Sequence, residues 1–96
     1  MKIKLDGYYL NVLINSLYSQ SKSYDEETNY QINTLILRLV NISDTMKPNR
    51  KKKITFEADE ASLIRYCLTD LLNNQIQAEK QTAAEVIGEL LIKFTG

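Results

Sequence analysis

The hydrophobic positions of the chain form one pattern that occurs twice. Apolar residues recur at helical spacing over Thr82–Phe94 (TAAEVIGELLIKF), and Thr28–Leu39 (TNYQINTLILRL) has the same arrangement. Each stretch opens with a Thr followed three residues later by Glu or Gln, the spacing of a capping box. In a capping box both side chains bind free N–H groups at a helix start. The pattern therefore predicts two amphipathic helices that begin at Thr28 and Thr82.

A short strand is predicted before each half of this pattern. Met1–Leu5 and Lys53–Glu57 both alternate apolar and polar residues, which is typical of half-buried strands. The alternation places Lys2 and Lys4 on one face of the first strand. The residues expected to face inward are Ile3, Leu5, Ile54 and Phe56.

A helix is then predicted after each strand, over about 8–20 with Asp6 as its cap and over about 60–75 with Asp59 or a neighbour as its cap. The expected buried stripes are Leu10, Leu13, Ile14, Leu17 and Tyr18 in the first of these helices and Ile64, Cys67, Leu68, Leu71 and Leu72 in the second. The helix that begins at Thr28 should bury Ile32, Leu35, Ile36, Leu39 and Val40, with Leu37 and Ile42 widening that face. The last helix should bury Ala83, Val86, Ile87, Leu90, Leu91 and Phe94. Because the helix from Thr28 is so apolar, we expect it to be the more central of its pair.

The predicted fold is α+β and mainly helical, in one domain of 96 residues. Two strand–helix–helix repeats, residues 1–46 and 53–96, are joined by a basic linker over 47–52. A pseudo-twofold arrangement would pair the strands antiparallel and place four helices on a two-stranded sheet, and a mainly α fold is the alternative. A lone two-stranded ribbon is marginally stable and leaves two unpaired edges, so we also expect a homodimer.

The composition narrows the classes of function. No apolar run reaches the roughly 20 residues that span a bilayer, and the charges among the first nine residues argue against a signal peptide. The single Cys cannot form an intramolecular disulfide, so we expect a cytoplasmic protein without a membrane partner. His is absent, which removes the usual general base and the commonest metal ligand. The sequence thus predicts a protein that is not an enzyme and holds no cofactor or metal.

The net charge of zero conceals an uneven distribution. Residues 47–53, KPNRKKK, carry five positive charges, whereas residues 1–46 sum to −1 and residues 54–96 to −4. Lysine and arginine bind nucleic-acid phosphates by releasing counterions. The candidate nucleic-acid contacts are Lys47, Arg50, Lys51, Lys52 and Lys53, with a solvated loop as the alternative interpretation.

Three of the six tyrosines are candidates for a protein interface. Tyr8, Tyr24 and Tyr30 fall off the apolar stripes, and tyrosine is favoured in interfaces because it offers contact area at little entropic cost. Packing at the edge of the core is the alternative. The acidic residues Asp25, Glu26 and Glu27 are further interface candidates, although their place before a helix also suits capping.

The duplicated segments also resemble a class of known proteins. KIKLDGYYLNVLINSL and KITFEADEASLIRYCLTDLL, each followed by a Thr-capped helix ending in LILRL or LLIKF, resemble small proteins of phages and mobile elements in low-GC Gram-positive bacteria. Some of these are anti-CRISPR inhibitors that bind a bacterial nuclease effector. The resemblance implies a non-enzymatic protein-binding inhibitor whose partner is a host protein or nucleoprotein complex. The alternatives are a small nucleic-acid-binding accessory protein that uses the basic linker and a structural homo-oligomer.

Overall fold

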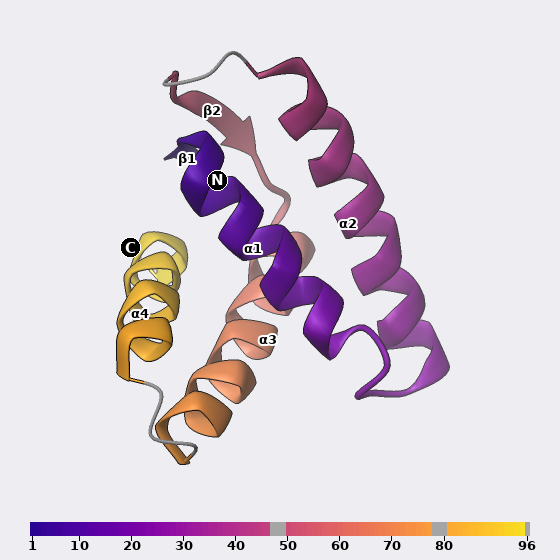
Figure 1. The fold of residues 1–96 in the computed structure, drawn as a ribbon. Coiled ribbons are helices and arrows are strands. Elements are labelled where there is room, and N and C mark those ends of the chain that lie inside the picture. The colour runs from indigo at the N-terminus through magenta and orange to yellow at the C-terminus, as the bar shows by residue number, and fades with distance from the viewer. Residues whose placement is uncertain (47–49, 78–80, 96) are drawn as a thin grey trace.

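The computed structural model describes residues 1–46, 50–77 and 81–95. In chain order these form β1 (Lys2–Leu5), α1 (Gly7–Gln20), α2 (Glu26–Thr45), β2 (Lys52–Thr55), α3 (Ala58–Gln77) and α4 (Gln81–Thr95) (Figure 1). The described chain is therefore α+β and mainly helical, with four helices and a two-stranded antiparallel sheet, which confirms the predicted fold class. The origin of the two halves as a repeat stays a prediction. None of the helices in these ranges is both long and apolar enough to cross a membrane.

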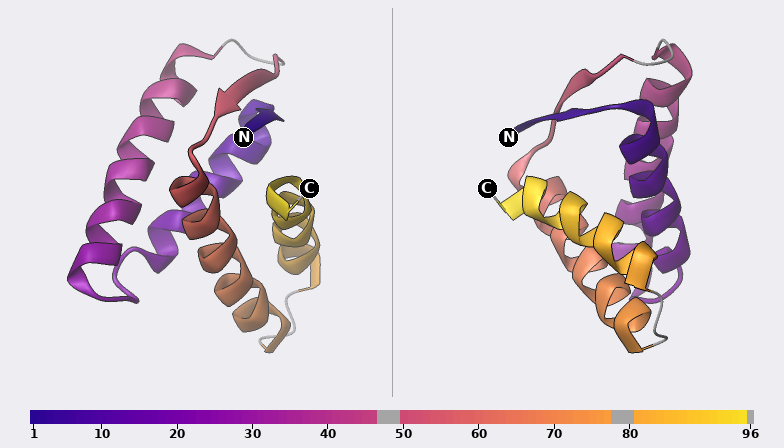
Figure 2. Two further views of the ribbon diagram at one scale, coloured as in Figure 1. Left: turned by 180° about the vertical axis from the view of Figure 1, so that it is seen from behind. Right: turned by 60° about the vertical axis from the view of Figure 1, so that its left-hand side comes forward.

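β1 and β2 pair antiparallel at one end of the molecule (Figure 1 and Figure 2), with Ile3 opposite Ile54. The ladder continues beyond β2, because Met1 and Phe56 exchange backbone hydrogen bonds of 3.0 and 2.7 Å. The pleat then buries the predicted inward residues, Ile3, Leu5, Ile54 and Phe56. β2 begins at Lys52, so the predicted linker is one residue too long at this end, and residues 47–49 lie outside the described residues.

α1 is the central helix of the fold. It packs against α2 on one side and against α3 and α4 on the other (Figure 1). The expectation that the helix over 28–42 is the more central one is therefore wrong. Apolar content alone does not give the number of neighbours of a helix. The face of α1 toward its neighbours includes the buried Ser16, whose hydroxyl donates to the Val12 carbonyl at 2.7 Å and so needs no partner outside the helix.

The buried face of α1 is rotated away from the predicted stripe. Leu10, Leu13 and Leu17 are fully buried, but Tyr18 is 71% exposed. Gln20, on the other side of the stripe, is buried in its place. The face of α2 is also narrower than predicted, because Leu37 and Val40 are exposed, and Leu71 and Leu72 of α3 are only half-buried.

The helix starts correct two of the predicted caps. Asp6 caps α1 as predicted, since its carboxylate accepts the Tyr9 N–H at 2.8 Å. Asp25 caps α2, because its side chain accepts the Thr28 N–H at 3.0 Å. Thr28 is therefore the third residue of the helix and not its N-cap. Thr82 is likewise inside α4, as its second residue. At the start of α2, an aspartate three residues before Thr28 supplies the cap, so the helix begins before Thr28 can act as one.

α3 begins with part of a capping box that the sequence pattern did not indicate. Asp59 lies within the first turn, so the cap falls on a neighbour, Glu57, whose carbonyl accepts the Ala61 N–H at 2.9 Å. The Glu60 carboxylate reaches back to the Glu57 N–H at 3.0 Å, as the third residue of a capping box does. This contact fixes the direction in which Glu60 leaves the helix.

The observed cap of α2 predicts unequal effects of two substitutions. Asp25→Ala removes the acceptor of the Thr28 N–H and should lower the urea midpoint of unfolding, whereas Thr28→Ala keeps that bond and should lower it less. Hydrogen bonds from Thr28 hold the pKa of Asp25 below its ordinary value of 3.8. The stability that Asp25 adds is therefore complete above that pH and is lost as the pH falls through the lowered pKa. Equal effects of the two substitutions on the urea midpoint at neutral pH would show that Asp25 is not the cap of α2.

Candidate functional site

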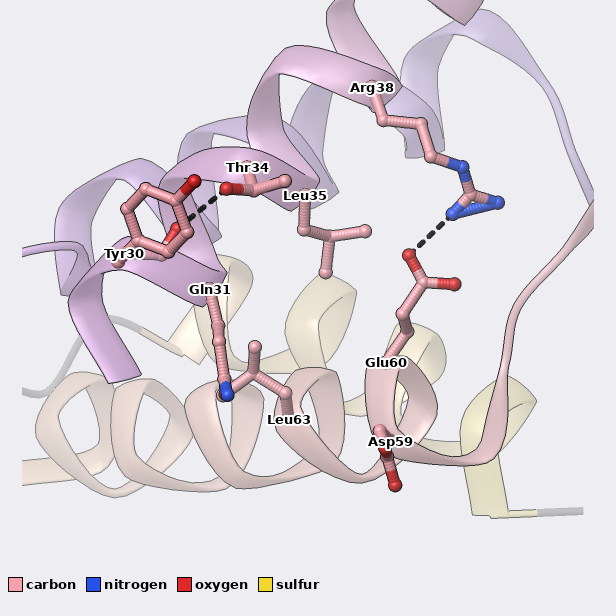
Figure 3. Close-up of a pocket in the computed structure, with 8 residues that line it drawn as sticks. All are labelled: Tyr30, Gln31, Thr34, Leu35, Arg38, Asp59, Glu60 and Leu63. Carbon is pink, nitrogen blue, oxygen red and sulfur yellow. Dashed lines mark hydrogen bonds and ion pairs between the residues drawn. The ribbon is translucent and has the colours of Figure 1, made fainter. Parts of the chain in front are cut away.

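α2 and α3 border an open groove, named here the α2–α3 groove. Leu35 of α2 and Leu63 of α3 point toward one another across it (Figure 3), around a cavity of about 280 Å³. A second hollow, which shares Gln31, Asp59 and Leu63 with the first, continues the groove toward the start of α2. The residues that line the two hollows are Tyr24, Asp25, Thr28, Tyr30, Gln31, Thr34, Leu35, Arg38, Asp59, Glu60, Ser62, Leu63 and Tyr66.

Arg38 crosses one end of the groove. Its Nη1 forms an ion pair with Glu60 Oε2 at 2.6 Å (Figure 3), and its Nη2 donates to the Thr55 carbonyl. The guanidinium also lies 5.5 Å from the centroid of the Phe56 ring, within the range of a cation–π contact. One side chain of α2 therefore ties this helix both to β2 and to the start of α3.

Tyr24 crosses the other end of the groove from the connection before α2. The Asn29 side chain binds both backbone groups of Tyr24, at 3.1 Å to its N–H and 3.0 Å to its carbonyl. The Tyr24 hydroxyl donates to Asp70 Oδ2 of α3 at 2.7 Å, and its ring lies 5.3 Å from the ring of Tyr66. The groove is thus held open between two polar cross-links, Tyr24–Asp70 and Arg38–Glu60.

The titratable groups beneath the Tyr24 end are held in their protonated forms. Burial raises the pKa of Tyr24, and the hydrogen bond to Asp70 raises it further. Burial also raises the pKa of the Cys67 thiol to about 11, and Cys67 is fully buried in α3, as the stripe predicted. A protonated, enclosed thiol is a poor nucleophile, so Cys67 belongs to the core.

The α2–α3 groove has an acidic rim. Asp25, Asp59 and Glu60 face a single cation, Arg38, among the lining residues, which gives the lining a formal charge of −2. Glu26 and Glu27 are exposed in the first turn of α2 and extend this negative surface. In the described ranges, no three His, Cys, Asp or Glu side chains lie close enough together to hold a metal ion.

The structure brings together half of the predicted interface residues. Tyr24, Tyr30 and Asp25 all line the groove, and Tyr30 is 71% exposed. Tyr8 is elsewhere, packed edge-on against Tyr9 with ring centroids 5.3 Å apart, in a hollow between α1 and α4. The hydroxyl of Tyr24 already has an internal partner, whereas the Tyr30 ring is open to solvent, so Tyr30 is the stronger candidate for contact with a partner.

The predicted basic residues lie outside the lining of the groove. Arg50 and Lys51 are exposed before β2, and Lys52 and Lys53 are exposed within it. Lys47 lies outside the described residues. Their contact with nucleic acid stays a prediction.

The α3 wall of the groove is not indicated by the pattern of apolar positions in the sequence. Asp59, Leu63, Tyr66 and Asp70 recur at four- and three-residue spacing, which places them on one helix face. That face lies beside the buried stripe of α3, and Tyr66 is 58% exposed on it. The feature of the sequence that could have indicated this wall is a second stripe of α3, partly polar, next to the apolar stripe.

A comparison of the chain with protein-family models, with curated proteins and with solved structures finds no match. The likeness to small phage and mobile-element proteins therefore stays a prediction. The function is therefore proposed from the chemistry of the surfaces of the fold.

Proposed function

We propose that this protein is a non-enzymatic binding module that holds a basic segment of a partner protein in the α2–α3 groove. The observation that supports this most directly is an apolar floor and an acidic rim at one place. Leu35 and Leu63 can contact an apolar side chain, while Asp25 and Asp59 attract flanking lysine or arginine. Tyr30 adds an exposed ring of the kind enriched in interfaces.

The geometry of the groove suits the binding of a partner, because its two walls are already held apart in fixed positions. Because Arg38–Glu60 joins α2 to α3 and Tyr24–Asp70 joins the connection before α2 to α3, the groove walls need little reordering when a partner arrives. A preorganised surface loses less conformational entropy on association. The negative rim would also increase the association rate of a positively charged partner at low ionic strength.

In its most specific form, the proposal is that the protein inhibits a host defence nuclease in the cytoplasm, as an anti-CRISPR-like phage or mobile-element product. Nucleases expose basic residues where they bind nucleic acid, and such residues complement an acidic groove. A second copy of this chain is the alternative occupant, because Arg50–Lys53 of one molecule could reach the groove of another. That alternative is the structural homo-oligomer.

The test compares two tyrosines of equal exposure. The protein is immobilised, partners are captured from host lysate and identified, and affinity is measured with the purified partner. Tyr30→Ala should weaken binding by about 30-fold, because truncation of an interface hot spot costs about 2 kcal/mol or more. Tyr18→Ala, on α1 and also 71% exposed, should leave affinity unchanged.

A second pair of substitutions tests the negative charge of the rim. Asp59→Asn should weaken binding and reduce its salt dependence, whereas Asp44→Asn, exposed near the end of α2, should do neither. Loss of binding with Tyr18→Ala but not with Tyr30→Ala would place the interface outside the groove. A protein that captures no partner and scatters light as a dimer would favour the homo-oligomer instead.

A further inference from the structure

The paired strands form a cationic surface that the proposed groove does not use. The pleat directs Lys2 and Lys4 of β1 and Lys53 of β2 to the outer face of the sheet, since their neighbours Ile3 and Ile54 are buried on the inner face. Arg50, Lys51 and Lys52 are exposed at the start of β2. Lys2, Lys4 and Lys53 on this outer face, together with Arg50, Lys51 and Lys52 beside it, are named here the cationic sheet face; Lys52 itself stands opposite the inward Leu5 at the end of the ladder. Residues 50–53 alone were predicted as a basic site, and the strand pairing adds Lys2 and Lys4.

Two of these lysines lie directly opposite one another. The register pairs Lys4 with Lys53. Because Met1 and Phe56 form a hydrogen-bonded pair, the alternation of an antiparallel ladder makes Lys4–Lys53 a non-hydrogen-bonded pair, in which side chains lie closest. Like charges at directly opposed positions destabilise a sheet.

No described acidic residue compensates this repulsion. The ion pair found among the described residues is Arg38–Glu60, and neither Asp6 nor Glu57, the acids that follow the two strands, pairs with the cationic sheet face. A two-stranded sheet is marginal even without such repulsion. The arrangement therefore weakens the fold in a way that an external anion would relieve.

We propose that the cationic sheet face binds the phosphate backbone of a nucleic acid, independently of the α2–α3 groove. Alternate residues of a strand are roughly 6.7 Å apart, so Lys2 and Lys4 present charges at about the axial rise of two phosphates of one DNA strand. Three lysines on the outer face of the sheet and three exposed cations at the adjoining start of β2 form an extended surface, which can follow a nucleic-acid backbone, rather than a point that binds one ion. Binding of this kind is independent of base sequence.

Membrane binding and edge protection are two alternative roles for these lysines. A lipid surface would need apolar side chains beside the cations to enter the bilayer, and the outer face of the strands carries lysines and Thr55. Charged residues also protect sheet edges from pairing with another chain. That protection is provided by charge of either sign, whereas phosphate binding needs cations. Reversing the charge therefore separates the two.

The first measurement is fluorescence anisotropy of a labelled DNA duplex and a labelled single-stranded RNA, titrated with the protein over a salt series. The parent should bind with a log–log salt slope of about −2 to −5, for three to six phosphate contacts. Lys2→Glu/Lys4→Glu should lose at least about tenfold in affinity, and its slope should become shallower by about 2. The double variant Lys22→Glu/Asn33→Asp, exposed on the α1–α2 connection and on α2, is the control and should keep both values near the parent's.

The second measurement separates binding from folding. Lys4→Glu alone places opposite charges across the ladder at Lys53, so its thermal midpoint should rise or hold while its affinity for nucleic acid falls. A fall in both the thermal midpoint and the affinity would mean that Lys4 stabilises the fold and does not contact nucleic acid. Binding that is insensitive to salt, an equal loss in the control, or binding to anionic phosphatidylserine vesicles without binding to either oligonucleotide would each overturn the proposal. Because the groove is unchanged in these variants, capture of a protein partner should persist whichever result is obtained.

Discussion

Phe56→Ala is expected to lower the free energy of unfolding by about 3–5 kcal/mol, the usual cost of removing a buried aromatic ring. Phe56 follows β2 and is fully buried, with its ring 5.1 Å from that of Phe94 in an edge-on arrangement. The same ring lies under the Arg38 guanidinium. The substitution therefore weakens the contacts of β2 with α4 and with α2 at once.

Ile92→Ala is the matched control for this substitution, because Ile92 lies on α4 near Phe94 but is 70% exposed. It should change stability by no more than about 0.5 kcal/mol. Urea unfolding followed by far-UV circular dichroism measures both variants. If Phe56→Ala lost less than about 1 kcal/mol, the ring would not be part of a packed core. Since small domains have only about 5–15 kcal/mol of stability in total, we expect the variant to be partly unfolded at room temperature.

Much of the core could be predicted from the sequence because burial of aliphatic residues follows the period of each element. The inward side of both strands and most of the described residues of the α3 and α4 stripes were correct, whereas the side chain of Ala83 lies outside the described ones. Tyr18 was wrongly predicted to be buried. It stands at helical spacing from Ile14, but a tyrosine side chain at that spacing can also point into solvent. The choice depends on where α3 and α4 cover α1, which no local pattern contains.

The helix caps show a second limit. Thr28 and Thr82 satisfy the capping-box spacing, but Asp25 caps α2 by accepting the N–H of Thr28, so the helix begins before Thr28. Local sequence therefore offered two alternative caps, Asp25 and Thr28, which would place the start of the helix three residues apart. Aspartate and threonine are both good N-caps, so the rank of their propensities does not decide between them.

The candidate site was predicted only in part because it is made of two elements. Tyr30 and Asp25 were found as residues off the stripe of α2, but Asp59 and Leu63 supply the facing wall from α3. Similarly, Lys2 and Lys4 join residues 50–53 only through the antiparallel register. In both cases the chemistry of each residue was visible in the sequence, and its neighbours were not.

The balance of charge has a structural meaning in this fold. The groove lining is negative, with Asp25 and Asp59 on its rim, whereas the cationic sheet face contains Lys4 and Lys53, which form no ion pair with a described acidic residue. A net charge of zero thus conceals two surfaces of opposite charge. A nucleoprotein partner presents both a basic protein surface and phosphates, so the two proposals are compatible with one partner.

The last prediction concerns alkaline pH. The pKa values of Tyr24 and Cys67 are both raised in the folded protein, above ordinary values of 10.0 and 9.0, and burial is the main cause for each. The neutral forms are therefore favoured by folding, and their contribution to stability is complete below those ordinary values. For Cys67 it is lost as the pH rises from 9.0 to about 11, and for Tyr24 the loss begins above 10.0. The urea midpoint should fall steeply over this range.

Tyr24→Phe separates the two groups. It keeps the ring against Tyr66 but removes the hydroxyl that donates to Asp70, so it should cost about 1 kcal/mol at neutral pH, as loss of a hydrogen bond does. Its midpoint should then fall less steeply above pH 10.0 than that of the parent, because the phenol no longer ionises on unfolding. Tyr18→Phe, at an exposed position, is the control and should follow the parent curve. A Tyr24→Phe variant that is as stable as the parent at neutral pH and equally sensitive to alkali would show that the Tyr24–Asp70 cross-link does not hold α2 to α3.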